Sequence, residues 1–357
     1  MFRGQFPAAS ARFLLLPRHN NFSQRTHLKK MNIIGLDFDG VLCASAEESS
    51  TSALLAAKKV WPTLFQRFEP HSKNFDDLRK LLLGVRPVIE VGFDSVLLTR
   101  FIFDNVFENQ TKNSFEVSKY IFDNWSANFR EELIKNYNTS RSELMEAFGS
   151  TRDALMKADL HHWVSLNPLY PEVLSYFNNT KDSIQKDKLF IITTKQERFV
   201  RAILSENKID WMILDGASHK HSPTDSIVIE QGYSNIYDFE NRFGSKLNVL
   251  FELSKQYSEN SLTKFQQLPI IHFVEDRFDT LIKIRNHLQQ EIQKLSNEST
   301  TSSMNNQELV RLKNFKLYLV DWGYNTEQQR NYVRELGDEN LQLINYQQFH
   351  ELMNKIC

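Results

Sequence analysis

The sequence predicts an α/β fold, in which a parallel sheet is interrupted after its first strand by a long helical insertion. Short apolar, β-branched runs alternate with amphipathic helical segments in the second half of the chain, as in parallel sheets with crossover helices. A block with helical spacing of its apolar residues, 46–179, separates the first such run from the others. Two aspartates end that first run, where parallel sheets place functional groups.

The expected elements follow in chain order. A buried strand is expected at 32–38, and the helical insertion comes after it. The further strands are expected at 188–194, 211–216, 269–276, 316–323 and 341–345. The helices between and after them are expected at 195–207, 245–258, 277–295 and 346–356. The polar, low-complexity stretch 297–308 is expected to be a surface loop. The predicted core is therefore formed by residues 31–45 and 180–357, and residues 46–179 form a helical cap.

The composition excludes several classes of protein. The 357 residues include 43 Lys and Arg against 44 Asp and Glu, so that no overall field favours nucleic acid or an anionic membrane. No apolar run approaches the roughly 18 residues needed to cross a bilayer. The two cysteines, Cys43 and Cys357, are too few for a disulfide framework, which indicates a reducing compartment.

The first 36 residues contain no Asp or Glu. Basic residues are interleaved there with Phe and Leu, and residues 1–30 are typical of a mitochondrial or plastid transit peptide. If translation starts at Met31 instead, the expected location is the cytoplasm. The basic residues are Arg3, Arg12, Arg18, Arg25, Lys29 and Lys30.

Polar groups stand at the ends of three expected strands. Asp37 and Asp39 follow the first strand, and Glu275 with Asp276 ends the strand 269–276. Because the carboxyl ends of parallel strands meet at one edge of the sheet, these side chains are expected to lie together. Thr193, Thr194 and Lys195 end the strand 188–194, and Lys246 lies at the start of the helix 245–258.

Carboxylates gathered in one place repel one another, and a divalent cation removes that conflict. A site lined by oxygen atoms suits Mg²⁺. With a phosphate bound there, one carboxylate can attack phosphorus and a second can serve as general acid and base. Thr hydroxyl and Lys ammonium groups can hold the remaining phosphoryl oxygens.

These residues resemble the four motifs of the haloacid dehalogenase superfamily. The segments are "DFDGVL", "FIITTK", "GSKLNVL" and "HFVEDRFD", in the family order, and the likeness covers roughly residues 31–350. The segments "LYP" and "VDWGYNT" also resemble plant and cyanobacterial members related to phosphoglycolate phosphatase. The resemblance implies a Rossmann-like core with a C1-type cap. It implies a Mg²⁺-dependent phosphatase that acts on a small phosphorylated metabolite.

Carried over to this chain, the resemblance makes Asp37 the nucleophile and Asp39 the general acid and base. Thr193 would bind the phosphoryl group, with Thr194 beside it, and Lys246 would neutralise charge. The implied metal ligands are Asp37, the backbone carbonyl of Asp39, Asp276 and Glu275. In the cap, Arg86 suits an anionic part of the substrate, although an ion pair between helices would explain it as well.

Several alternatives stay open. Asp279 competes with Glu275 and Asp276 as a metal ligand, and Lys220 and Lys195 compete with Lys246 as the third-motif lysine. A phosphotransferase or mutase of the same fold, a metal-free dehalogenase and a non-catalytic binding module remain alternative functions. The dehalogenase is disfavoured by Asp39, because displacement at carbon needs no acid for the leaving group. The substrate and the oligomeric state do not follow from the sequence.

Overall fold

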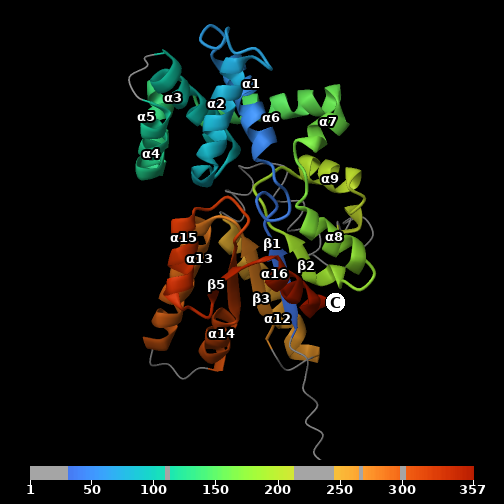
Figure 1. Cartoon of the computed structure of the whole chain (residues 1–357). Coiled ribbons are helices and arrows are strands. Elements are labelled where there is room, and N and C mark those ends of the chain that lie inside the picture. The colour runs from blue at the N-terminus through green and yellow to red at the C-terminus, as the bar shows by residue number, and fades with distance from the viewer. Residues whose placement is uncertain (1–30, 109–112, 213–244, 265–267, 298–302) are drawn as a thin grey trace, which may run out of the picture.

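The computed structural model describes residues 31–108, 113–212, 245–264, 268–297 and 303–357 (Figure 1). The expected leader, most of the expected strand 211–216 and Lys220 lie outside these residues.

The described strands form one parallel sheet of five, in the order β2-β1-β3-β4-β5. Each neighbouring pair is parallel, and β1 is paired with β3 from Asn32↔Ile270 to Leu36↔Val274. All carboxyl ends therefore lie at one edge, with β1 between β2 and β3. The bounds are β1 Asn32–Leu36, β2 Leu189–Ile191, β3 Ile270–Glu275, β4 Phe315–Val320 and β5 Leu341–Ile344.

Helices cover both faces of the sheet, since alternate residues of each buried strand point to opposite sides. On one face, residues such as Leu36 and Val274 pack against α7, α8, α9 and α16. On the other face, Ile33 and Phe273 pack against α12, α13, α14 and α15. The bounds are α7 Leu160–Ser165, α8 Pro171–Thr180, α9 Glu197–Glu206, α12 Lys246–Lys264, α13 Phe278–Asn297, α14 Ser303–Lys313, α15 Glu327–Leu336 and α16 Tyr346–Met353.

The segment between β1 and β2 is helical, as predicted, and its first part has an apolar core of its own. That core extends from Ala53 to Phe148 and lies above the sheet in Figure 1. The last two helices of the segment, α7 and α8, instead bury Trp163 and Phe177 with the sheet. The bounds are α1 Ala46–Val60, α2 Lys73–Gly84, α3 Gly92–Ile102, α4 Ser114–Asn124, α5 Ala127–Asn136 and α6 Arg141–Ala158, with a short 3₁₀ helix η1 Arg86–Val88 and a π-helix Phe103–Glu108.

The predicted α/β class and the parallel sheet are confirmed, and two element predictions are wrong. Residues Asp210–Met212 form a 3₁₀ turn where a strand was expected to begin. The expected loop 297–308 contains the start of α14 at Ser303, because Leu312 of that helix packs on the core. Among the described residues, no helix has the length and apolar character to cross a membrane.

Candidate active site

The turn that leaves β1 carries the first two carboxylates. Asp37 is the first residue after the strand, and its backbone N–H donates to Val274 O of β3 at 2.9 Å. Phe38 O then accepts from the N–H groups of Leu42 and Cys43, which closes a tight turn. Gly40 has φ +82°, a conformation that glycine adopts without strain, so that the turn folds back directly beside the strand end.

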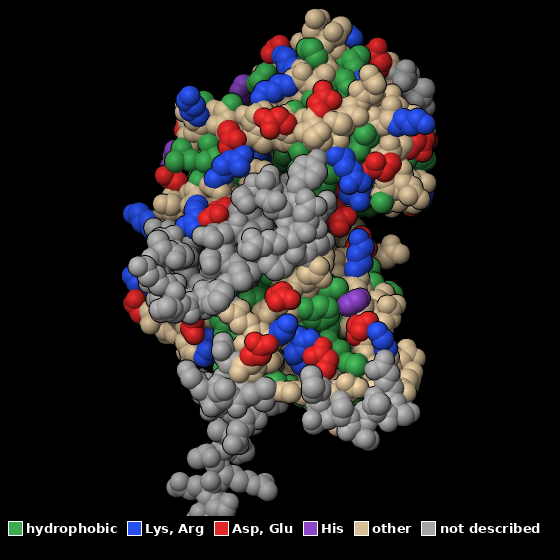
Figure 2. Space-filling view, turned by 180° about the vertical axis from the view of Figure 1, so that it is seen from behind, with side chains coloured by type: hydrophobic (Ala, Val, Ile, Leu, Met, Phe, Trp, Pro, Cys, Tyr) green, Lys and Arg blue, Asp and Glu red, His purple; other side chains and the backbone are tan. Residues whose placement is uncertain are grey.

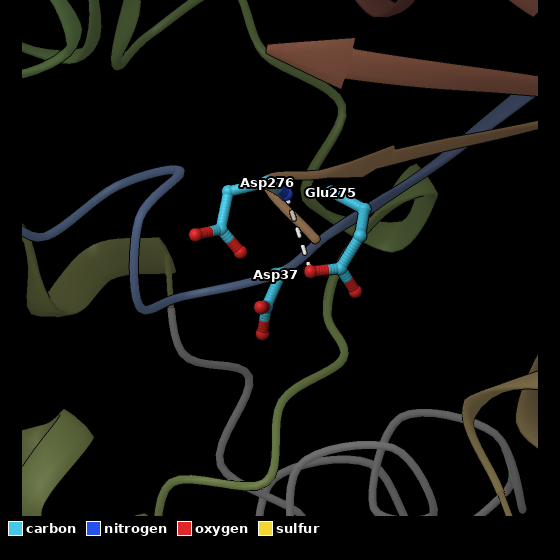
Figure 3. A group of neighbouring side chains, drawn as sticks. All are labelled: Asp37, Glu275 and Asp276. Carbon is cyan, nitrogen blue, oxygen red and sulfur yellow. Dashed lines mark hydrogen bonds between the residues drawn. The ribbon is translucent and has the colours of Figure 1, made fainter. Parts of the chain in front are cut away.

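Three carboxylates converge at this edge of the sheet. Asp37 follows β1, Glu275 is the last residue of β3 and Asp276 follows it (Figure 3). Each contributes a carboxylate oxygen to a group in which all distances are within 4.8 Å, and all three residues are buried. The sequence prediction that these three residues meet agrees with this geometry. Asp279, in the first turn of α13, is exposed and lies outside the group.

Lys246 joins two of the three acids. Its Nζ lies 2.9 Å from Asp37 Oδ2 and 2.7 Å from Glu275 Oε2. The other oxygen of Glu275, Oε1, accepts from the backbone N–H groups of Asp276 at 3.2 Å and Arg277 at 3.1 Å. Both oxygens of Glu275 are therefore already bonded, and this carboxylate is placed to orient Lys246.

Asp37 and Asp276 retain coordinating capacity. Asp37 Oδ1 is buried and has no hydrogen-bond partner. Asp276 Oδ2 accepts from Tyr324 N at 2.9 Å, while Asn325 Nδ2 donates to Asp276 O at 2.9 Å. These bonds fix Asp276 against the loop after β4 and leave its carboxylate facing Asp37.

Burial and the charge of Glu275 raise the pKa of Asp37 to about 7, although Lys246 opposes the shift. Burial and the charge of Asp37 likewise raise the pKa of Asp276. Two buried acids with raised pKa values, side by side, are held at a cost in free energy. A cation between them would remove that cost.

Two glycines allow the close packing around Asp276. A Cβ on Gly40 would lie 2.0 Å from Asp276 Oδ2, and a Cβ on Gly323 would lie 2.3 Å from Asp276 Cβ. Any side chain at either position would displace this carboxylate. The loop after β1 and the loop after β4 therefore clamp Asp276 from both sides.

A second ionic group surrounds Asp39. Lys195 Nζ lies 3.1 Å from Asp39 Oδ1 and 3.2 Å from Asn167 Oδ1, and 4.0 Å from Glu48 Oε2. Burial raises the pKa of Asp39, but Lys195, Arg86 and Arg152 together lower it further, so that the pKa lies below its usual range. Lys195 therefore pairs with Asp39, and Lys246 pairs with Asp37.

Behind Lys195 lies a fully buried acid, Glu48 of α1. Arg152 of α6 binds it through two nitrogens, at 2.9 and 2.7 Å. Trp163 Nε1 and Ser52 Oγ also donate to Glu48 Oε1, at 3.2 and 2.6 Å. Sequence reasoning missed this network, together with Asn167 and Tyr324. The residues next to Glu48 at helical spacing, Thr51 and Ser52, are polar as well, so the local sequence gives no signal for this network.

The predicted site residues share a cavity of about 440 Å³ between the sheet edge and the helices above it. Its core side includes Thr193, which is buried, and Thr194; Thr193 Oγ1 accepts from Lys195 N at 3.2 Å. Arg86 faces the cavity from the other side, stacked at 4.2 Å on the ring of Tyr324. The predicted site residues that line the cavity are Asp37, Asp39, Arg86, Thr193, Thr194, Lys246 and Asp276. Glu275 is the exception: it does not line the cavity and contacts Lys246 instead.

Figure 2 shows the face opposite that of Figure 1, on which part of the surface belongs to described residues. Positive and negative side chains are interspersed over it in Figure 2. The concentrated charge of the described residues lies inside the cavity instead.

Comparison with known proteins gives only distant likenesses. No family model matches the chain, and no curated protein matches it. A predicted phosphatase from Clostridium acetobutylicum is similar at 13% identity and TM-score 0.41, with 91% of this chain and 99% of that one covered. A predicted phosphoglycolate phosphatase from Haemophilus somnus 129pt is similar at 15% identity and TM-score 0.40, with 90% and 97% covered. A haloacid dehalogenase-like hydrolase from Streptococcus pneumoniae is similar at 12% identity and TM-score 0.37, with 89% and 96% covered. At TM-scores below 0.5, no function is transferred from these proteins to this chain.

Proposed function

We propose that this chain is a Mg²⁺-dependent phosphatase of the haloacid dehalogenase type, which hydrolyses a small phosphate monoester through a phosphorylated Asp37. The observation that supports this most is the buried Asp37. It has one oxygen without a partner, an acid beside it and a lysine on its other oxygen. The resemblance of the four motifs supports the same function.

The residues present fit a magnesium ion. Asp37 Oδ1 is a buried oxygen without a partner, and Asp276 lies within reach of the same point. We infer that Asp37, Asp276 and the backbone carbonyl of Asp39 hold the metal, and that Glu275 serves Lys246 instead. When bound, Mg²⁺ would neutralise the acids and withdraw charge from the phosphoryl oxygens.

Asp37 would attack phosphorus and displace the alcohol of the ester, which forms an aspartyl phosphate. Lys246 favours the ionised, nucleophilic form of Asp37, against the burial and the charge of Glu275 that raise its pKa, and it would hold the carboxylate in one orientation. Lys246 can also neutralise an oxygen of the transferred group, as a fixed cation in a buried site does most effectively. Thr193 and Thr194, which line the cavity, would donate hydrogen bonds to the other phosphoryl oxygens.

Asp39 would protonate the leaving oxygen and later take a proton from the attacking water. In the ligand-free site, Lys195 favours the ionised form of Asp39. A phosphate dianion bound beside it would raise its pKa again by repulsion between like charges. Asp39 can thus receive the proton it needs when the substrate binds.

The assay that tests this function measures release of inorganic phosphate from p-nitrophenyl phosphate and a panel of phosphate monoesters, with and without Mg²⁺. Hydrolysis that needs Mg²⁺ and no acceptor alcohol is expected. A phosphotransferase would need the acceptor, and a binding module would release no phosphate.

Magnesium should stabilise the folded protein, because it binds the native acid group and not the unfolded chain. At a hundredfold excess over Kd the gain is about 2.7 kcal/mol, and a melting temperature several degrees higher is expected. Asp276→Asn should remove most of this gain, and thermal melting in Mg²⁺ and in EDTA measures it. Asp279→Asn is the matched control, since Asp279 is exposed on α13 and should leave the gain intact. An unchanged gain in Asp276→Asn would place the metal elsewhere.

A further inference from the structure

We propose that the substrate carries a second anionic group, a carboxylate or a further phosphate, and that Arg86 binds it. This rests on the proposed function, because it concerns the ligand of the same cavity. The observation behind it is that Arg86 is a buried cation that faces the catalytic carboxylates, while no acid of the described residues lies at ion-pair distance from it.

The cavity is rich in cations. Of the residues that the structure describes, eight basic side chains line it against four acidic ones, Asp37, Asp39, Glu90 and Asp276. The basic side chains are Arg86, Arg130, Arg141, Arg152, Lys195, Lys246, Arg277 and Lys283. A cavity with such an excess favours an anionic ligand, but cations that are already paired contribute less to binding it.

Seven of these eight cations face an acid at ion-pair distance. Lys195 and Lys246 hold Asp39 and Asp37, and Arg152 holds Glu48. Arg141 pairs with Glu131 at the surface. Arg130 lies 3.2 Å from Asp94, and Glu90 lies 3.4 to 3.9 Å from Arg130, Lys283 and Arg277.

Arg86 is different. The residue is 9% exposed, and no carboxylate of the described residues lies within 4.0 Å of its guanidinium. Its Nη1 donates to Ile89 O at 3.3 Å, and its Nε is buried without a partner. The charge of Arg86 lowers the pKa values of Asp39 and Asp276, but only from beyond ion-pair distance. A buried cation whose bonding is incomplete is costly, and a ligand anion would complete it.

The position of Arg86 is fixed by the core and not only by its own helix. Its guanidinium lies 4.2 Å from the centre of the Tyr324 ring, and the Tyr324 hydroxyl accepts from Ala46 N at 2.8 Å. Tyr324 N in turn donates to Asp276. Tyr324 therefore fixes the position of Arg86 relative to Asp276, the carboxylate that we assign to the metal.

The planar guanidinium can bind a carboxylate or a phosphate through two parallel hydrogen bonds. The transferred phosphoryl group already has Lys246, Thr193 and the metal ligands around it. A second anion of the same ligand would meet Arg86 on the cap side of the cavity. Phosphate esters without such a group would leave Arg86 unpaired and should bind more weakly.

The test is calorimetric binding to the Asp37→Asn variant in Mg²⁺, which needs no turnover. Two matched pairs of ligands are compared. 3-Phosphoglycerate and glycerol 3-phosphate differ by a carboxylate, and propane-1,3-diol bisphosphate and propyl phosphate differ by a phosphate. In at least one pair, the ligand with the second anionic group should bind about 10- to 100-fold more tightly than the ligand without it. This is the range expected for a hydrogen bond to a charged group. The pair with the larger ratio identifies the second anion.

Adding Arg86→Gln should reduce that ratio to about threefold or less. Arg86→Lys should retain part of it, because the charge remains and the paired geometry is lost. Arg141→Gln is the matched control: this arginine lines the same cavity but is already paired, and its loss should leave the ratio unchanged. Thermal melting confirms that each variant is folded.

Three results would overturn the inference. These are equal affinities within both pairs, no binding by any of the four ligands, or an equal loss for all four in Arg86→Gln. The last would mean that Arg86 contacts the shared phosphate. A failure of the proposed function has a different signature, since wild type would then release no phosphate from any ester, whatever the affinities in Asp37→Asn.

Discussion

Replacing Asp37 by Asn is expected to abolish phosphate release, with kcat lower by on the order of 10⁴-fold or more. The amide is nearly isosteric but cannot attack phosphorus. Steady-state assays with p-nitrophenyl phosphate in Mg²⁺ measure the loss. Asp279→Asn, an equally conservative change on the exposed side of α13, should retain full activity. Substantial hydrolysis by Asp37→Asn would mean that another group is the nucleophile.

The same variant separates a catalytic role from a structural one. Because the pKa of Asp37 is raised from 3.8 to about 7 in the folded protein, the native state binds more protons than the unfolded state between these values. The free energy of unfolding of the metal-free protein therefore falls as pH rises through that range, by on the order of a few kcal/mol. Asp37→Asn should lack this part of the fall.

Denaturant unfolding in EDTA at pH 5 and pH 8 measures this difference. In wild type the free energy of unfolding should be lower at pH 8, and the difference should be smaller in Asp37→Asn. Asp37, the residue expected to be essential for activity, would then lower the free energy of unfolding of the protein at neutral pH. An identical pH dependence in the two proteins would show that Asp37 is not held in the environment described above.

The second large effect is expected at Arg152. This residue is 6% exposed and binds the fully buried Glu48 through two nitrogens. Arg152→Met should lower the free energy of unfolding by about 3–5 kcal/mol, because it leaves a buried carboxylate with only Trp163, Ser52 and the more distant Lys195 near it. Equilibrium unfolding in urea measures the change.

Two variants make this prediction specific. Arg198→Met breaks an exposed pair between Asp153 and the first turn of α9 and should cost less than about 1 kcal/mol. The double variant Glu48→Gln/Arg152→Met should recover part of the loss, since no unpaired charge is left behind. If Arg152→Met costs no more than Arg198→Met, the buried network does not stabilise the fold. Activity in the double variant should also fall, because Lys195 loses the acid behind it.

Much of the fold follows from the sequence because the strands are short, mostly apolar runs bounded by polar segments. Ile33 and Ile34 of β1 are both fully buried, one against each layer of helices. A short run that is apolar on both sides is typical of a buried parallel strand. The segment 303–308 was misjudged because its polar composition is that of a loop, whereas its helix is secured by Leu312 packing on the core. That contact is tertiary and leaves no local signal.

The candidate site was predictable where it depends on strand ends, and not where it depends on chain segments meeting in space. Asp37 and Asp276 follow adjacent parallel strands, so their proximity could be inferred from order and register. The resemblance points to Lys246 as the third-motif lysine, with Lys195 and Lys220 as alternatives, and Lys246 is the lysine that lies at Asp37. The pairing of Lys195 with Asp39 and the support of Arg86 by Tyr324 join distant segments, and no spacing rule reveals them.

The proposed hydrolysis depends on transfer of the phosphoryl group to Asp37. The direct measurement is to quench the enzyme in acid during turnover, reduce it with borohydride and sequence its peptides by mass spectrometry, since borohydride converts an aspartyl phosphate to homoserine. Homoserine is expected at residue 37 alone, only with Mg²⁺ and substrate present. Homoserine at another acid, or unmodified Asp37 in an enzyme that is turning over, would contradict the account.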